Sequence, residues 1–408
     1  MSPEREVDVL VVGAGPAGLA AAARLAAAGV GRVEVLDRER QAGGVPRHCA
    51  HGGYGTWPHP LTGPAYAHLL VTAAERAGAV VRTGVTALDW AGPLSLHTVG
   101  PHGPEAVGAR AVVLATGARE RPRAARLVPG TRPAGVYTTG ELQQAVHLYG
   151  RRIGTRAVVV GAEDVSYAAA DTVRAAGASV VAMVTELARP QTAPARAADA
   201  RLRHGIPLLT GTTVTELLGH GRLSGVRVRR RDGRTATLPC DTVVFTGDFV
   251  PDHELARRGG LTLDAGTRGP SVDGALRTSR PGVFAVGSVL HAVASAATAA
   301  REGAHAAGAV LDTLAGTERP DGVPLIVDPP LRWIAPNRVT PADRLPYVLR
   351  TAAPPPRRPV LRVTQNGLLL HRERTLLPNR SPALTLTARW TERVDPRGGP
   401  VRVTLTDP

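Results

Sequence analysis

The stretch 7–18 constrains the fold of this chain more than any other. It reads Val-Asp-Val-Leu-Val-Val-Gly-Ala-Gly-Pro-Ala-Gly, and its first six residues, one aspartate aside, predict a buried parallel strand. Gly13, Gly15 and Gly18 then form a G-x-G-x-x-G turn, and the Ala-rich segment Leu19–Ala28 predicts a helix. Strand, glycine turn and helix in this order are typical of the βα unit that binds a dinucleotide, which predicts an α/β fold.

Each glycine of this turn has a predicted role. Gly13 makes the tight turn, Gly15 lets the backbone approach a pyrophosphate, and Gly18 lets the helix pack closely on the strand. The free N–H groups at the positive end of the helix then face the phosphates. A second strand, expected over Arg32–Leu36, is followed by Asp37, which lies where an acid that binds the ribose hydroxyls belongs. The alternative is a glycine turn that binds nothing.

The composition narrows the classes of partner. A chain of 408 residues is long enough for two or three domains. The formal charge of +15 comes from arginines spread along a sequence without lysine, and the longest basic run is 229–231, so nucleic-acid binding is not expected. Glycines and Pro16 interrupt the apolar stretch Val9–Val30, so no membrane span is expected. The first strand begins too early to leave room for a signal peptide, which favours a cytoplasmic protein.

Two cysteines, Cys49 and Cys240, are too few for a disulfide framework or a four-cysteine metal site, and no metal is expected. Cys49 lies in a glycine-bounded loop with His48 and His51, and these three are the catalytic candidates. An imidazole that titrates near neutrality would shuttle a proton. A reactive Cys49 would need a lowered pKa, which Arg47 and the histidines would supply; the alternatives are a packing cysteine and a well-packed surface loop.

Motifs along most of the chain resemble the two-dinucleotide-binding-domain flavoproteins of the pyridine nucleotide–disulfide oxidoreductase superfamily. The resemblance is carried by the opening turn, Asp37, Gly43-Gly44, Ala115-Thr116-Gly117, 241–248 and 278–287. A narrower group is similar at 47–51, 61–66, 240–242 and 289–291. It holds the flavoproteins that accompany glycerol-3-phosphate-dehydrogenase-like and opine- or hydroxyproline-oxidase-like subunits.

The resemblance implies that the first nucleotide is FAD. It places the pyrophosphate at the opening turn, the adenosine ribose at Asp37, and the ribityl part at Gly287-Ser288. The implied cofactor contacts are Gly13, Gly15, Pro16, Ala17, Gly18, Asp37, Arg38, Gly43, Gly44, Val85, Ala115, Thr116, Gly117, Gly287 and Ser288. The superfamily usually has Gly-Asp at the last position, and the hydroxyl of Ser288 binds a ribityl oxygen more weakly than a carboxylate does.

A second dinucleotide turn is expected midway, where the superfamily binds NAD(P)H. Ala157–Val160 predicts its strand, but the turn 161–166 keeps only its first glycine. Glu163 stands where a backbone must approach phosphate, and Ser166 replaces the glycine that packs the helix. Glu163 and Asp164 would repel a pyrophosphate and compete for the helix N–H groups. NAD(P)H binding is therefore disfavoured, while the fold of this unit can persist.

These observations predict two Rossmann-like nucleotide-binding domains, the second inserted in the first, and a small C-terminal β domain. The expected bounds are 1–122 with 238–316 for the FAD domain, 123–237 for the inserted domain and 321–408 for the β domain. Residues 318–330 are expected to form a linker. The short strands expected after it are Leu361–Thr364, Leu368–His371, Leu384–Trp390 and Val401–Leu405.

The function expected from this reading is an FAD-dependent oxidoreductase. It would pass a hydride or electrons between a small-molecule substrate and an acceptor or partner subunit, such as a second flavoprotein or electron-transfer subunit. The β domain carries no recognisable catalytic group and would serve docking. Two alternatives stay open: an NAD(P)H-dependent flavin reductase, and a non-catalytic subunit that carries flavin as a scaffold.

Overall fold

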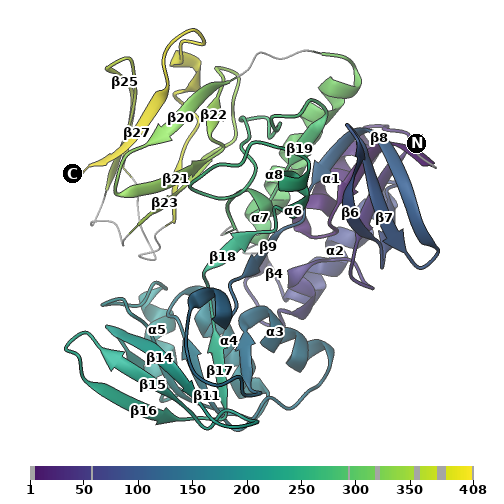
Figure 1. Ribbon diagram of the computed structural model, residues 1–408. Coiled ribbons are helices and arrows are strands. Elements are labelled where there is room, and N and C mark those ends of the chain that lie inside the picture. Colours follow the sequence, from purple (N-terminus) through teal and green to yellow (C-terminus); the bar gives the residue numbers. More distant parts are fainter. Residues whose placement is uncertain are drawn as a thin grey trace.

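The computed structural model describes residues 5–56, 58–292, 295–317, 322–352, 359–374 and 383–406. Figure 1 shows three units, which we name by their residues: the first unit (5–117 and 252–317), the second unit (121–248) and the C-terminal unit (322–406). None of the described helices is long and apolar enough to cross a membrane.

A seven-stranded sheet forms the core of the first unit. Its order is β5-β2-β1-β8-β7-β6, with β19 beside β8. Strands β2, β5 and β19 run parallel to their neighbours, whereas β6, β7 and β8 form an antiparallel meander. The strands are β1 Arg5–Val12, β2 Val33–Asp37, β5 Val80–Thr83, β6 Thr86–Gly92, β7 Ser95–Gly100, β8 Gly103–Leu114 and β19 Val283–Ala285. The helices are α1 Pro16–Ala27, α2 Gly63–Arg76, α6 Glu254–Arg258, α7 Ser288–His291 and α8 Ala296–Leu314.

Small residues let the helices of this unit pack closely. A Cβ at Gly303 of α8 would lie 1.9 Å from the carbonyl oxygen of Ala17 in α1, so the two helices cross backbone against backbone. The apolar stretch 80–88 forms parts of two strands, β5 and β6, because the chain turns at Gly84 between them.

The second unit has a parallel sheet in the order β10-β17-β11-β12-β13 and an antiparallel sheet β14-β15-β16. Its strands are β10 Val136–Thr138, β11 Arg156–Val160, β12 Ser179–Val184, β13 Leu208–Leu209, β14 Thr212–Leu218, β15 Gly225–Arg230, β16 Thr235–Pro239 and β17 Thr242–Phe245. Its α-helices are α3 Thr139–Gln143, α4 Asp164–Ala175 and α5 Pro194–Leu202, and a π-helix over Gln144–Leu148 follows α3.

The chain returns from the second unit to the first later than expected. Strand β17 pairs with β10 and β11, so the segment that begins at 238 still belongs to the second sheet. The crossing is made by a two-stranded ribbon of β9 (Ala118–Glu120) and β18 (Phe249–Pro251). In Figure 1 this ribbon lies between the two units. A short apolar strand such as β17 fits either core, and only the pairing decides which sheet contains it.

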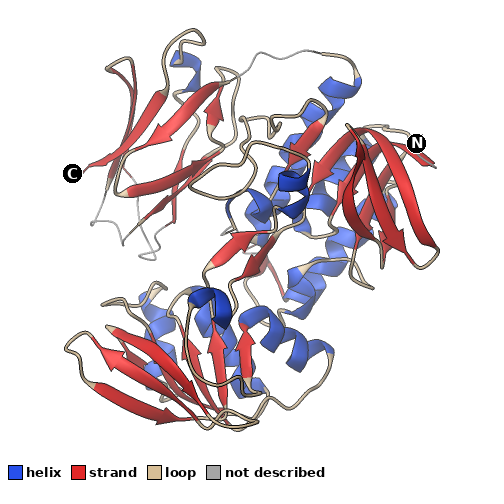
Figure 2. Cartoon of the chain, in the orientation of Figure 1, coloured by secondary structure: helices blue, strands red, loops and turns tan. Residues whose placement is uncertain are grey.

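The C-terminal unit consists of two small sheets, β22-β20-β27-β24-β25 and β21-β23-β26, packed around Trp390 and Tyr347. Figure 2 shows that strands dominate this unit. The strands are β20 Val323–Val327, β21 Leu331–Ala335, β22 Arg338–Val339, β23 Tyr347–Thr351, β24 Val360–Gln365, β25 Leu368–Arg374, β26 Ala383–Leu386 and β27 Val401–Thr406.

Two expectations for the C-terminal unit need correction. The linker expected over 318–330 contains β20, which pairs in parallel with β27, because alternate apolar residues of β20 are buried in this core; residues 318–321 lie outside the described part. The strand expected over Leu384–Trp390 ends at Leu386, and Trp390 lies in a turn where its ring fills the core.

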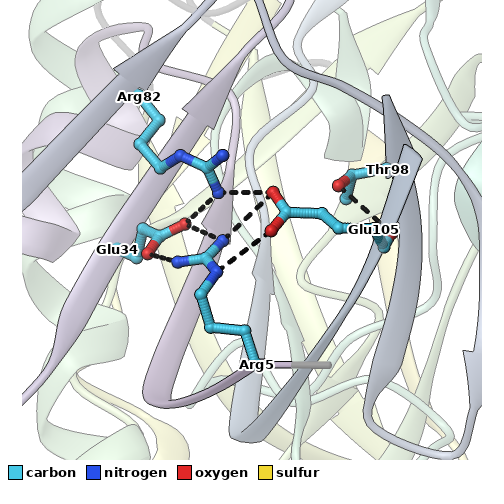
Figure 3. Close-up of polar contacts among 5 residues, drawn as sticks. All are labelled: Arg5, Glu34, Arg82, Thr98 and Glu105. Atoms are coloured by element: carbon cyan, nitrogen blue, oxygen red, sulfur yellow. Dashed lines mark hydrogen bonds and ion pairs between the residues drawn. The ribbon is translucent and has the colours of Figure 1, made fainter. Parts of the chain in front are cut away.

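A network of two arginines and two glutamates ties four strands of the first sheet together (Figure 3). Glu34 of β2 is 1% exposed and pairs with Arg5 of β1 and with Arg82 of β5, the latter at 3.1 Å. Arg82 also lies 2.6 Å from Glu105 of β8, and Arg5 lies 3.2 Å from it. Burial alone would raise the pKa of Glu105, but the hydrogen bonds from the two arginines outweigh it and lower the pKa.

We expect Glu34→Ala to cost about 3–5 kcal/mol of the free energy of unfolding, because it leaves two arginine side chains without their buried partner. The control is Glu392→Ala, which removes an exposed ion pair with Arg344 and should cost about 0–1 kcal/mol. Urea unfolding followed by circular dichroism measures both. Equal losses in the two variants would contradict a structural role for the network.

Candidate functional site

One large cavity lies where the three units meet. Its volume is about 1840 Å³, larger than the roughly 300–1,000 Å³ of a site for one small ligand. Of the residues expected to bind or act, all but Gly18, Gly43 and Gly287 line it. The lining includes Gly13, Gly15, Pro16, Ala17, Asp37, Arg38, Gly44, His48, Cys49, His51, Val85, Ala115, Thr116, Gly117 and Ser288.

The opening turn leaves room for a ligand at the N-terminus of α1. At Gly13, where φ is +110°, a Cβ would lie 2.3 Å from the carbonyl oxygen of Ala115, and a Cβ at Gly18 would lie 2.0 Å from that of Gly13. A Cβ at Gly15 would meet nothing within 4 Å. Gly15 caps α1 with no side-chain hydrogen bond. The first N–H groups of α1 are thus left for an anion in the cavity.

Asp37 and Gly44 complete this side of the cavity. The carboxylate of Asp37 accepts the N–H of Ala14 at 2.7 Å and that of Glu39 at 2.8 Å, and burial raises its pKa. Each carboxylate oxygen keeps a further lone pair for a hydroxyl. Gly44 has φ +63°, and a Cβ there would lie 2.8 Å from the Cα of Gly15. The glycine turn 13–18 and Gly44 therefore border a part of the cavity that is lined by backbone, which suits a dinucleotide.

The second turn is closed by its own side chains. Glu163 is the N-cap residue of α4: its backbone carbonyl oxygen accepts the N–H of Ser166 at 2.8 Å, and the hydroxyl of Ser166 accepts the N–H of Glu163 at 3.1 Å. Arg350 of the C-terminal unit lies 3.7 Å from the carboxylate of Glu163. The Ser166 hydroxyl is 2.6 Å from that of Thr246. At α4 a carboxylate of the chain thus lies at the helix N-terminus that α1 leaves free.

His48 is buried in a 3₁₀ turn, Val45–His48, on the cavity wall. Burial, together with the smaller effects of the nearby charges of Arg47 and His147, lowers its pKa to about 4. The expectation that this imidazole titrates near neutrality is therefore wrong. At neutral pH His48 presents an uncharged ring to the cavity.

Cys49 is buried beside the second unit. Its Sγ donates to Oε1 of Gln143 at 3.4 Å. Burial raises the pKa of the thiol, while hydrogen bonds with Tyr54 and Gln143 act in the opposite direction. The lowered pKa that a reactive thiolate needs is therefore absent, since desolvation outweighs these hydrogen bonds. The His51 ring lies 5.6 Å from that of Tyr54, and its Nδ1 is 2.7 Å from the Gly52 carbonyl oxygen.

Three further side chains on the cavity wall escaped sequence reasoning. They are Tyr54, Glu120 and Gln143. Glu120 lies on β9, and its Oε2 accepts the N–H of Gly140 at 2.8 Å. Burial raises the pKa of Glu120 and of Tyr54. None of the three belongs to a spaced motif. Tyr54 follows Cys49 in the same loop, and the approach of the two units brings Glu120 and Gln143 to it. Among the described residues no three His, Cys, Asp or Glu side chains are grouped to hold a metal ion.

Comparison with known proteins places this geometry in a family. The model of the pyridine nucleotide-disulphide oxidoreductases matches residues 7–303. Ferredoxin–NADP reductase of Salinispora tropica is 31% identical over 297 residues, which cover 70% of this chain and 86% of that enzyme. Thioredoxin reductase of T. acidophilum superposes with a TM-score of 0.65 at 25% identity, over 75% of this chain and 98% of that one.

The chain is also similar to a subunit of a larger enzyme. Sarcosine oxidase subunit alpha of Corynebacterium sp. strain P-1 is 31% identical over 363 residues, which cover 81% of this chain. The chain spans 35% of the length of that subunit and 28% of the corresponding subunit from strain U-96.

The two Rossmann-like sheets, the glycine turn and the family match together define a flavoprotein oxidoreductase. The chain belongs to the pyridine nucleotide-disulphide oxidoreductase family, and its cofactor is FAD.

The stability of the fold should depend on pH through His48. The unfolded chain takes up a proton near pH 6.5 and the folded chain only near pH 4, so stability should fall as the pH drops from 6.5 to 4. The loss is at most on the order of 3 kcal/mol. Melting temperatures between pH 4 and pH 7.5 measure it. His48→Gln should flatten this slope, whereas the exposed control His102→Gln should not; identical slopes in all three proteins would contradict the assignment.

Proposed function

We propose that this chain is an FAD-dependent oxidoreductase subunit. It takes a hydride or electrons from a small-molecule substrate and passes them to a partner subunit or another acceptor. The observation that carries the proposal is the contrast between two helix N-termini that both line the cavity: α1 begins at Gly15, which has no side chain, whereas α4 begins at Glu163, whose carboxylate lies 3.7 Å from Arg350. A pyrophosphate would meet free N–H groups at α1 and a carboxylate at α4.

The residues of the first unit fit FAD. The N–H groups that begin α1 would bind the pyrophosphate, Asp37 the adenosine ribose, and Ser288 the ribityl hydroxyls. Gly44 and Thr116-Gly117 would approach the cofactor, since all three line the cavity. When bound, the flavin supplies the redox chemistry, and the protein supplies position and electrostatics.

The loop with His48, Cys49 and His51 would border the reacting substrate. Its groups are held in uncharged forms by burial: a neutral imidazole at His48, a thiol at Cys49 and a phenol at Tyr54. Such a wall excludes water and accepts or donates hydrogen bonds without opposing charge transfer. We assign proton transfer to His51, which lies at the cavity, as it is the less buried of the two histidines.

Two observations support a partner subunit. With Glu163 at the second turn, electrons need an exit other than a nicotinamide. Within the described residues the two cysteines are both free and buried, so no dithiol relays electrons. The similarity to a protein named as a subunit of sarcosine oxidase agrees with this assignment.

The competing function is an NAD(P)H-dependent flavin reductase, favoured by the similarity to ferredoxin–NADP reductase. It requires a pyrophosphate at α4, where the carboxylate of Glu163 and its Arg350 partner already lie. A non-catalytic scaffold subunit would carry flavin but show no turnover.

FAD should co-purify with the chain, and Gly15→Glu should empty the site, because the new side chain would point into the space that the pyrophosphate needs. The visible flavin spectrum of the purified protein measures both. Gly308→Glu, at an exposed position of α8 that is equally free of neighbours, has no positive φ and lies away from the cavity, is the matched control and should keep its flavin. A colourless wild-type protein, even after FAD is supplied, would overturn the proposal.

NADH and NADPH should reduce the flavin poorly, because Glu163 repels a pyrophosphate at α4. Stopped-flow absorbance at 450 nm follows the reduction, with dithionite as the positive control. Rapid bleaching by either nucleotide that Glu163→Arg abolishes would favour the flavin reductase instead.

A further inference from the structure

A buried acid and a buried histidine lie behind the Gly287-Ser288 turn, outside the cavity wall. Glu302 of α8 accepts the N–H of Gly287 with Oε2 at 3.0 Å, and its Oε1 lies 3.0 Å from Nε2 of His291. The side chains of the pair are 1% exposed for His291 and 6% for Glu302. A buried carboxylate is costly unless hydrogen-bonded, so these two contacts fix where Glu302 lies.

The turn that this pair holds is pressed against the open end of α1. A Cβ at Gly287 would lie 2.6 Å from the Cβ of Ala17. Ala17 and Ser288 both line the cavity. A shift of the turn would therefore displace the hydroxyl of Ser288 and press on the first residues of α1. The hydrogen bond from the Gly287 N–H to Glu302, on the side of the turn away from the cavity, prevents that shift.

The C-terminal unit contacts the same pair. Trp333 of β21 stacks on His291, with ring centroids 5.9 Å apart and an angle of 18° between the planes. Nδ1 of His291 is buried and has no hydrogen-bond partner among the described residues, so the ring is held by Glu302 on one side and by Trp333 on its face. Nearby, the side-chain amide of Asn337 bonds Ser271 and Asp264 of the first unit, which fixes the C-terminal unit in place.

We propose that Glu302 and His291 are positioning residues of the FAD site, and that Trp333 makes the cofactor affinity depend on the C-terminal unit. The pair holds the Gly287-Ser288 turn against α1, and Trp333 holds the imidazole in the orientation that Glu302 needs. This inference rests on the assignment of FAD to this turn under the proposed function. It gives the C-terminal unit a second role beside docking: a partner that moves this unit would change how tightly the flavin is held.

The test is the dissociation constant for FAD, measured by titrating full-length apoprotein with FAD and following flavin fluorescence. In Glu302→Gln the side chain has only one oxygen to accept from both the Gly287 N–H and the Nε2–H of His291. The alternative is that His291 changes its tautomer, which places an N–H at Nδ1, where it has no partner among the described residues. We expect the dissociation constant to rise about 10- to 100-fold. Trp333→Ala should raise it less, and Trp333→Phe, which keeps a ring on His291, should restore the wild-type value.

The matched control is Glu34→Gln, which alters an equally buried and paired carboxylate far from the turn. It should lower the melting temperature and leave the dissociation constant unchanged. Because Trp333 acts through His291, the effects of Glu302→Gln and Trp333→Ala should not multiply in the double variant.

The outcomes separate this inference from the proposed function. A wild-type protein that binds no FAD overturns the proposed function. A wild-type protein that binds FAD, with unchanged affinity in Glu302→Gln and Trp333→Ala, overturns this inference alone and leaves the pair as a structural contact. If Glu302→Gln does not fold, the comparison of Trp333→Ala with Trp333→Phe decides, and equal affinities in these two variants overturn the inference.

Discussion

The N-terminus of α1 is the point at which distant parts of this chain meet. Gly44 approaches it so closely that a Cβ there would lie 2.8 Å from the Cα of Gly15, and α8 crosses it so closely that Gly303 has no room for a Cβ. The Gly287 turn presses on Ala17 from a third direction. Each approach needs a residue without a side chain. Glycine is needed at these positions because three backbone segments pack closely around one helix end.

The two nucleotide-binding folds of the molecule differ mainly in what satisfies the first N–H groups of their helices. Every helix begins with N–H groups that lack a partner within the helix. At α1 the protein leaves them open to the cavity, and at α4 the backbone carbonyl oxygen of Glu163 accepts the N–H of Ser166. We propose that the carboxylate of Glu163 repels a pyrophosphate at α4, so that this unit keeps the fold without the nucleotide. Arg350 joins this carboxylate to the C-terminal unit.

Burial shapes the remaining chemistry of the cavity. The charges of the first sheet lie in a balanced network, in which Glu34 and Glu105 each face two arginines. On the cavity wall, burial lowers the pKa of His48 and raises that of Cys49, which keeps both uncharged at neutral pH. Charge is thus balanced by pairing in the sheet, whereas burial neutralises these two groups of the cavity wall.

The sequence by itself determined the parts of this protein that depend on local order along the chain. The strand, glycine turn and helix at 5–27, the acid at Asp37 and the altered turn at 161–166 could all be inferred from spacing, because each role is confined to a few consecutive residues. The strands β24, β25, β26 and β27 of the C-terminal unit were also predicted, whereas β21, β22 and β23 were not, and β20 was taken for a linker. The protonation state of His48 was not, because burial is not written in the neighbouring residues.

Only the tertiary structure decided which distant residues share a site. Gln143 meets Cys49, Arg350 meets Glu163, and Trp333 meets His291, across separations of tens to hundreds of residues. It also decided that β17 belongs to the second sheet. The physical reason is that packing and desolvation depend on what surrounds a side chain in space, whereas turns and helix ends depend on the residues beside it in the chain.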